Sequence, residues 1–236
     1  MSQPPLDPKM FDAYAAQYDA ALQQGLSVSG ETKDYFSRGR INWLAQVLTR
    51  LGEEPQSVLD FGCGTGTSSR LFRETWPPAQ ILGVDVSAKS LEVARQLHGN
   101  LRIEFASLAE HRPEERFYLA FCNGVFHHIL PRERPEAVNF IYRSLRPGGL
   151  LAFWENNPWN PGARIVMKRI PFDRDAIPLS PIAARRLLRA AGFQMVQTDF
   201  LFIFPRILKC CRGLEPLLSR LPLGAQYQIL CRKPAA

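Results

Sequence analysis

The chain has 236 residues and 46% of them are apolar, which is enough for one well-buried domain. No apolar run approaches the roughly 20 residues that span a bilayer, and the first residues do not resemble a signal peptide, so we expect neither feature. The charge is uneven, because residues 161–236 hold 13 Lys and Arg against 4 Asp and Glu, whereas residues 1–160 hold 16 against 18.

The cysteines indicate a reducing compartment. There are five of them, an odd number, and they do not stand at the spacing of metal ligands. Two are adjacent in sequence, and two lie in predicted core strands. We therefore expect free thiols, no metal site and a cytoplasmic protein. These residues are Cys63, Cys122, Cys210, Cys211 and Cys231.

The predicted elements alternate along the chain after a helical N-terminal segment. Residues 10–51 carry apolar side chains at helical spacing, and we expect them to cover the first strand. Strands are then predicted near 57–61, 81–86, 102–106, 117–123, 149–155, 194–203 and 226–232, and helices near 67–76, 88–97, 133–145 and 180–191. This alternation predicts a parallel sheet with helices on both faces.

The most informative segment follows the first strand. Apolar residues lead into Asp60, and glycines then stand at 62, 64 and 66, before a helix that begins near Thr67. Glycines at such a turn let the backbone approach a ligand, and the free N–H groups of the helix start face it. The pattern predicts a nucleotide-like cofactor. It differs from a dinucleotide fingerprint, because its third glycine comes one residue early.

The second strand supports this interpretation, because it ends in an acid. Asp85 is placed to accept hydrogen bonds from ribose hydroxyls. The alternative is that Asp85 caps the helix over 88–97, a task that Ser87 could perform equally well.

The pattern D-x-G-x-G-x-G over residues 60–66 resembles the first motif of class I S-adenosylmethionine-dependent methyltransferases. His127-His128-Ile129 and Leu145-Arg146-Pro147-Gly148-Gly149 follow in the order of that family, and the resemblance covers about residues 57–155. It implies an α/β fold with a Rossmann-like, doubly wound sheet of seven strands, the last two forming an antiparallel hairpin. We expect a single domain over 1–236, with a helical cover (1–52), a cofactor core (53–155) and substrate-side inserts with the hairpin (156–236).

The resemblance also implies a site for S-adenosylmethionine. The loop glycines would contact its methionine part, Asp85 its ribose, Val86 its adenine, and the Asn123 backbone its amine. Ser107 stands where many relatives place an acid for the adenine amino group, and the Leu108 backbone is the alternative. An arginine before the first strand could pair with the cofactor carboxylate; a solvated helix face is the alternative. The expected cofactor residues are Tyr18, Arg40, Asp60, Gly62, Cys63, Gly64, Gly66, Asp85, Val86, Ser107, Leu108 and Asn123.

Methyl transfer needs alignment of the reactants and, for some acceptors, a base. His127 and His128 follow the fourth strand and Glu155 ends the fifth, so each is a candidate general base. The alternative for the histidines is packing beneath the cofactor and bonding to the loop backbone. Catalysis by positioning alone is a further alternative.

Two inserts lie outside the predicted core. Residues 156–179 are expected to cover the substrate, and residues 205–225 are amphipathic and basic, which predicts a lid helix or contact with a membrane surface. The basic C-terminal third favours a small acceptor that is anionic or lipid-linked, and a solvated basic surface is the alternative. The rival classes are an RNA or other nucleic-acid methyltransferase, a nicotinamide-dependent oxidoreductase and a non-catalytic cofactor-binding protein. The acceptor atom (O, N or C) and the oligomeric state stay open.

Overall fold

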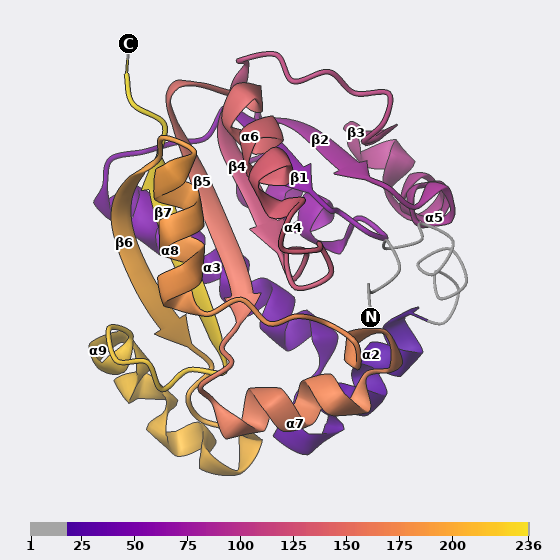
Figure 1. Ribbon diagram of the computed structural model, residues 1–236. Helices are drawn as coiled ribbons and strands as arrows, with labels where there is room; N and C mark the ends of the chain where they lie inside the picture. Colours follow the sequence, from indigo (N-terminus) through magenta and orange to yellow (C-terminus); the bar gives the residue numbers. More distant parts are fainter. Residues whose placement is uncertain (1–17, 236) are drawn as a thin grey trace.

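The computed structural model describes residues 18–235, with side chains from residue 22 onward. Its centre is a seven-stranded sheet in the order β3-β2-β1-β4-β5-β7-β6 (Figure 1). The strands β1 to β5 are parallel, and β7 runs antiparallel to both β5 and β6, as predicted. The strands are β1 (Ser57–Phe61), β2 (Gln80–Asp85), β3 (Ile103–Ser107), β4 (Phe117–Asn123), β5 (Leu145–Asn156), β6 (Gln194–Leu201) and β7 (Gln226–Arg232).

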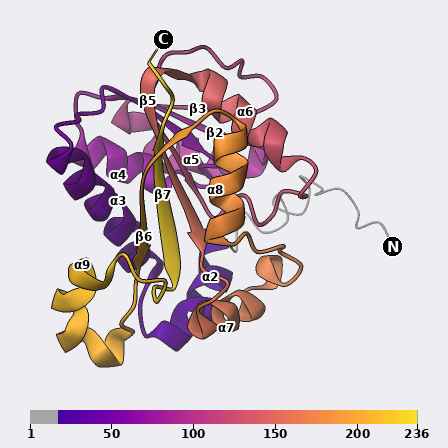
Figure 2. The same ribbon diagram turned by 60° about the vertical axis from the view of Figure 1, so that its left-hand side comes forward.

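Helices cover both faces of this sheet because its central strands are apolar on both sides. In β1, Leu59 belongs to the core on one face and Val58 to the core on the other. Helices α6 and α8 cover the first of these cores and α3 and α4 the second, as Figure 2 shows. The helices of these layers, with α5 beside β2 and β3, are α3 (Lys33–Arg50), α4 (Thr67–Thr75), α5 (Ala88–His98), α6 (Arg134–Ser144) and α8 (Pro181–Ala190).

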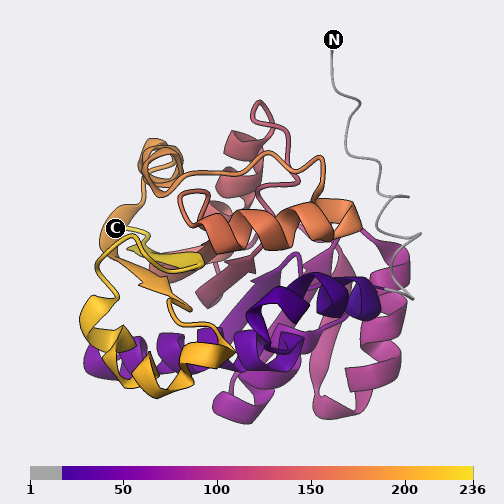
Figure 3. The same cartoon turned by 90° about the horizontal axis from the view of Figure 1, so that it is seen from below.

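Two further helices lie across the carboxyl ends of the strands. Seen from below in Figure 3, α2 (Tyr18–Leu26) and α7 (Pro161–Arg169) lie side by side. The short helical turns η1 (Ser27–Ser29) and η3 (Pro171–Asp173) follow them, and η2 (Gly99–Leu101) precedes β3. The sequence predicted a covering insert here without a helix. The local signals were present, since Asn160 caps α7 and Pro161 takes its first position.

The second insert is not a lid. It forms η4 (Arg206–Leu214) and α9 (Glu215–Leu218) at the lower end of the outer strand β6, and none of its residues lines the cavities described below. Arg212 holds it to the N-terminal segment through Glu31, at 2.8 Å, and lies over the ring of Tyr35. Ile207 and Leu217 are 88% and 82% exposed. Among the described helices, none is long and apolar enough to cross a membrane.

Helix α7 depends on its cap, and this can be tested by substitution. The Asn160 Oδ1 accepts from the N–H of Ala163 at 2.9 Å, and its Nδ2 donates to the carbonyl of Leu223 at 2.7 Å. We expect Asn160→Ala to lower the free energy of unfolding by about 1–2 kcal/mol in urea denaturation. Asn160→Asp keeps the capping oxygen and should lose less. If the urea midpoint of the alanine variant equals that of the wild type, the assignment of Asn160 as the stabilising cap of α7 is wrong.

Candidate active site

A cavity of about 290 Å³ opens where β1, β2 and β4 end. Its walls come from the loops that follow these strands, including Gly62, Gly64, Asp85 and Asn123. The carboxyl edge of an open parallel sheet is where such folds bind their ligands. The cavity therefore lies where the sequence placed the cofactor.

The loop after β1 leaves open space directly above Gly64. This residue has a φ of +52°, and a Cβ added there would meet no atom within 4 Å. Its N–H donates to Asp85 Oδ2 at 2.8 Å, while Asp85 Oδ1 accepts from the N–H of Ser87 at 2.9 Å. Ser87 itself caps α5 by accepting from the N–H of Ser90. The carboxylate of Asp85 is thus fixed at the cavity rim and does not cap the helix.

Asn123 is the central polar group of the site. Its side chain lines the main cavity and two adjoining chambers of about 100 Å³ and 90 Å³. Its Oδ1 is buried and has no hydrogen-bond partner among the described residues. A buried carbonyl oxygen normally has a donor, and the ammonium of the S-adenosylmethionine amino-acid part would be one. With the open space over Gly64, this makes the site fit that cofactor.

Asp60 has an unusual protonation equilibrium. Burial raises its pKa to about 7, although a hydrogen bond from Ser69 Oγ to Asp60 Oδ2, at 2.6 Å, opposes the shift. Asp60 lines the 90 Å³ chamber together with Gly64 and Arg40. We call this space the methionine chamber, because it adjoins the glycine loop.

Several predicted cofactor residues have other surroundings. Gly66 lines none of the three cavities, and a Cβ there would approach His98 Cδ2 and Phe105 Cζ at 2.9 Å, so packing requires this glycine. The thiol of Cys63 is buried, which raises its pKa well above the ordinary value, and only the methionine chamber includes this residue.

The adenine end of the predicted site differs too. The Ser107 Oγ accepts from the N–H of Ala109 at 3.3 Å and lines no described cavity. The N–H of Leu108 donates to the carbonyl of Asp85, so Leu108 reaches the main cavity as a wall residue, as does Val86. Tyr18 begins α2, and its side chain lies outside the described part of the structure.

The 100 Å³ chamber, which we call the acceptor chamber, joins the main cavity at Asn123, Gly124 and His128. It is bordered by α2, α3, α7, η3 and the start of β7. Arg40 borders both this chamber and the methionine chamber. Its guanidinium donates to Gln226 Oε1 at 2.9 Å and to Ser37 Oγ at 3.1 Å, which fixes its position.

The loop after β4 brings the three predicted bases together. Glu155 is 1% exposed and lines no described cavity. Its Oε1 accepts from the N–H groups of Phe126 and His127 at 2.8 and 3.3 Å, and its Oε2 lies 2.6 Å from His127 Nδ1. Glu155 therefore orients the loop and has no direct path to an acceptor.

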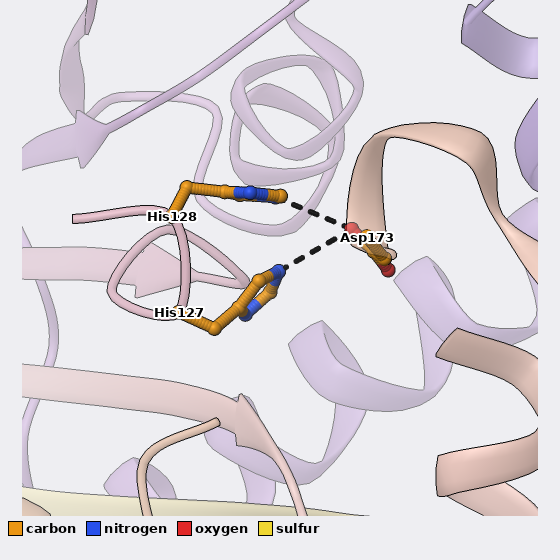
Figure 4. Close-up of side chains that lie close together, drawn as sticks. All are labelled: His127, His128 and Asp173. Carbon is orange, nitrogen blue, oxygen red and sulfur yellow. Dashed lines mark ion pairs between the residues drawn. The ribbon is translucent and has the colours of Figure 1, made fainter. Parts of the chain in front are cut away.

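The two histidines converge on a third group that the sequence did not reveal. Asp173 Oδ1 lies 3.5 Å from His127 Nε2 and 3.3 Å from His128 Nε2 (Figure 4). Burial would lower the pKa of His127, but Glu155 and Asp173 raise it to about 10. Burial and the adjacent His127 lower the pKa of His128, while both histidines hold the pKa of Asp173 at about 2 against the effect of burial.

Sequence reasoning missed other chamber residues. Lys33, Asp173 and Gln226 all border the acceptor chamber, and they come from three segments that are far apart in the sequence. No local motif marks them. The sequence indicated this part of the chamber in one way only: residues 171–176 belong to an insert that we expected to cover the substrate.

Comparison with known proteins shows the family of this chain. Residues 58–149 match the methyltransferase domain family. A trans-aconitate 2-methyltransferase from Methylobacterium nodulans is 33% identical over 230 residues, which cover 85% of each protein. The same enzyme from Rhodopseudomonas palustris is 34% identical over 124 residues, and there the chain spans about half of the relative, 46% of its length.

Solved structures share the fold. An S-adenosylmethionine-dependent methyltransferase from Thermotoga maritima superposes with a TM-score of 0.64 at 20% identity, covering 95% of this chain and 98% of that one. The chain belongs to the class I S-adenosylmethionine-dependent methyltransferases, and its cofactor is S-adenosylmethionine.

The different roles of two loop glycines can be separated experimentally. Both have positive φ, but only Gly66 lacks room for a side chain. We expect Gly66→Ala to cost roughly 2 kcal/mol or more of unfolding free energy, and Gly64→Ala only about 1 kcal/mol. Gly64→Ala should weaken S-adenosylmethionine binding at least about tenfold in calorimetry, because its Cβ enters the cavity. Equal effects of both substitutions on stability and binding would refute this division.

We expect Asp60 to make cofactor binding depend on pH. Because its pKa is raised to about 7, the carboxylate forms as the pH rises through that value. A sulfonium and an ammonium favour the carboxylate, so S-adenosylmethionine affinity should rise about tenfold from about pH 6 to about pH 8 and then level off. Calorimetry of Asp60→Asn provides the control, since this variant should show a flat profile. A wild-type profile that is equally flat would disprove the link.

Proposed function

We propose that the protein transfers a methyl group to a carboxylate oxygen of a small acceptor, forming a methyl ester. The observation that carries this proposal is the acceptor chamber, which adjoins the cofactor cavity and contains Lys33 and Arg40 in its wall. Two cationic side chains in the wall of a small chamber suit an anionic ligand. Leu22, Phe36 and Phe172 in the same wall suit an apolar body attached to it.

The two cations can serve different partners. Arg40 and Lys33 both border the methionine chamber as well as the acceptor chamber. We assign Arg40, which donates to Ser37 in the wall of the methionine chamber, to the carboxylate of the cofactor, in line with the sequence prediction. Lys33 is the first residue of α3, and we assign it to the carboxylate of the acceptor. The amide of Gln226 holds Arg40 and donates to Asn156 Oδ1 at 3.0 Å, which gives this side of the chamber a fixed polar surface.

A carboxylate acceptor explains why the site needs no exposed general base. Such a group has an ordinary pKa of about 4, so it is already ionised at neutral pH. When bound, S-adenosylmethionine supplies an electrophilic methyl group on a sulfonium, and the acceptor oxygen displaces neutral S-adenosylhomocysteine. The protein then has to orient the oxygen and exclude water, and such alignment can supply roughly 7–11 kcal/mol of the barrier.

Two other observations support the proposal. The relative from Methylobacterium nodulans is named for trans-aconitate, which is a carboxylate. The acceptor chamber is bordered by Asp173, but two histidines already surround that group, so it does not leave a bare negative charge facing the ligand.

A cytoplasmic location for the protein fits the five free cysteines.

The insert of η4 and α9 supports a membrane contact less directly. Its exposed Ile207 and Leu217 stand near basic residues, but the segment lines no described cavity. A lipid-linked acceptor would have to reach a chamber that this insert does not border. We therefore favour a free carboxylate as the acceptor. Contact of the insert with a membrane would affect where the protein is located and not which molecule it methylates.

The test is methyl-ester formation from a panel of small di- and tricarboxylates, followed by mass spectrometry. We expect Lys33→Gln to lower kcat/KM for the acceptor about 10- to 100-fold while cofactor affinity stays within about threefold, since a hydrogen bond to a charged group contributes about 1.5–3 kcal/mol. Arg40→Gln should weaken cofactor binding by a similar factor. Lys168→Gln, on the exposed side of α7, is the matched control.

Two results would overturn the assignment. One is methylation of amines or hydroxyls with no methyl ester from any carboxylate. The other is a Lys33→Gln variant that performs like the Lys168→Gln control in both measurements.

A further inference from the structure

We propose that His127, His128 and Asp173 bind a divalent transition-metal ion in the wall of the acceptor chamber. The ligands would be Nε2 of each histidine and Oδ1 of the aspartate (Figure 4). The sequence predicted no metal, and methyl transfer to a carboxylate does not require one. The site is therefore an addition to the proposed function.

The distances within the cluster match those between ligands of one ion. The three ligand atoms lie within 4.8 Å of one another, with Asp173 Oδ1 at 3.5 Å and 3.3 Å from the two imidazole nitrogens. Ligand atoms about 2.0–2.2 Å from a metal lie about 3.0–3.5 Å apart at octahedral or tetrahedral angles. The two aspartate–histidine distances fall in that range, and Figure 4 shows both rings directed at the same carboxylate.

Asp173 lies at ion-pair distance from both histidines, but neither contact has the geometry of a good hydrogen bond. Asp173 is 7% exposed, and its Oδ1 has no hydrogen-bond partner among the described residues, although both nitrogens approach it. A buried carboxylate oxygen without a donor is costly. Coordination of a cation would satisfy this oxygen and both nitrogens at once.

The surroundings of the cluster have the organisation of a metal site. His127 Nδ1 lies 2.6 Å from Glu155 Oε2, a contact that directs the other nitrogen, Nε2, toward the ion. The backbone fixes the partners, because the N–H of Ile177 donates to the carbonyl of His127 at 2.8 Å and joins the loop after β4 to the segment that carries Asp173. Glu155 in turn accepts two backbone N–H groups.

The ligand set selects the kind of metal. Two imidazoles and one carboxylate suit Zn²⁺, Fe²⁺, Co²⁺ or Mn²⁺ better than Ca²⁺ or Mg²⁺, which prefer oxygen ligands. A divalent charge also matches the two buried carboxylates of Asp173 and Glu155. Among the other nearby cations, Arg134 donates to the carbonyls of Ile129 and Ile177, while Lys33 and Arg40 border the chamber.

Three protein ligands leave at least one coordination position for another molecule. All three residues border the acceptor chamber, so that position is available to an anionic acceptor. This role rests on the proposed function, whereas metal binding itself does not. The ion would hold one carboxylate of a polycarboxylate while Lys33 holds another.

The experiment measures metal binding without cofactor or acceptor. The full chain is treated with a chelator, dialysed, and titrated with Zn²⁺ and Co²⁺ by calorimetry and absorption spectroscopy, with bound metal counted by mass spectrometry. We expect one equivalent to bind at micromolar or lower Kd. His128→Ala and Asp173→Asn should weaken binding by at least about 100-fold, and Glu155→Gln by about 10- to 100-fold. Asp175→Asn, an exposed neighbour, and His111→Ala are the controls.

Folding of the variants is checked independently by circular dichroism, and His128→Gln replaces any variant that does not fold. The ion should raise the Tm of the wild type and not that of the folded ligand variants. Absence of binding by the wild type, or unchanged binding by both His128 and Asp173 variants, overturns the proposal. Methyl-ester formation is measured separately, so failure of the metal site does not count against the carboxylate acceptor.

Discussion

The buried carboxylate of Glu155 is the contact on which the rest of the site depends. It lies one residue before the end of β5 and accepts the backbone N–H groups of Phe126 and His127, so it fixes the loop after β4 against the neighbouring strand. The N–H of Gly124, which donates to the carbonyl of Trp154, reinforces the same junction. This loop separates the cofactor cavity from the acceptor chamber. A charged group that the sequence indicated as a candidate base thus supports the wall between the cofactor cavity and the acceptor chamber.

The parts of the fold that follow local rules could be predicted from the sequence. The parallel sheet with helices on both faces followed from alternating apolar strands and helices, and the cofactor edge followed from the glycine loop and Asp85. Helix α7 was missed, although Asn160 and Pro161 are ordinary start signals, because a segment rich in Pro and Asn suggested an irregular cover. The role of Gly66 could not be predicted from the sequence. Gly64 leaves room for a ligand, whereas Gly66 is needed for packing against Phe105, and the sequence does not distinguish these two roles.

The acceptor chamber could not be predicted, because long-range contacts build it. Lys33, Asp173 and Gln226 become neighbours only when α3, η3 and β7 meet at one edge of the sheet. The contact between Asp173 and the two histidines is also a long-range contact that no local motif marks. The histidines were found from their position after β4, but their partner lies over 40 residues further along the chain, in a segment without a motif.

The origin of the chamber walls has an evolutionary consequence. The strands and loops that we assign to the methyl donor lie within the segment matched by the family, 58–149, and Arg40 of α3 is the assigned residue that lies outside it. Most of the acceptor chamber instead comes from segments on either side of it, α2 and α3 before and α7, η3 and β7 after. Substitutions, insertions or exchanges in these outer segments can therefore change which molecule is methylated while the donor site keeps its geometry. Such a division lets one ancestral donor-binding core diversify into enzymes for many acceptors.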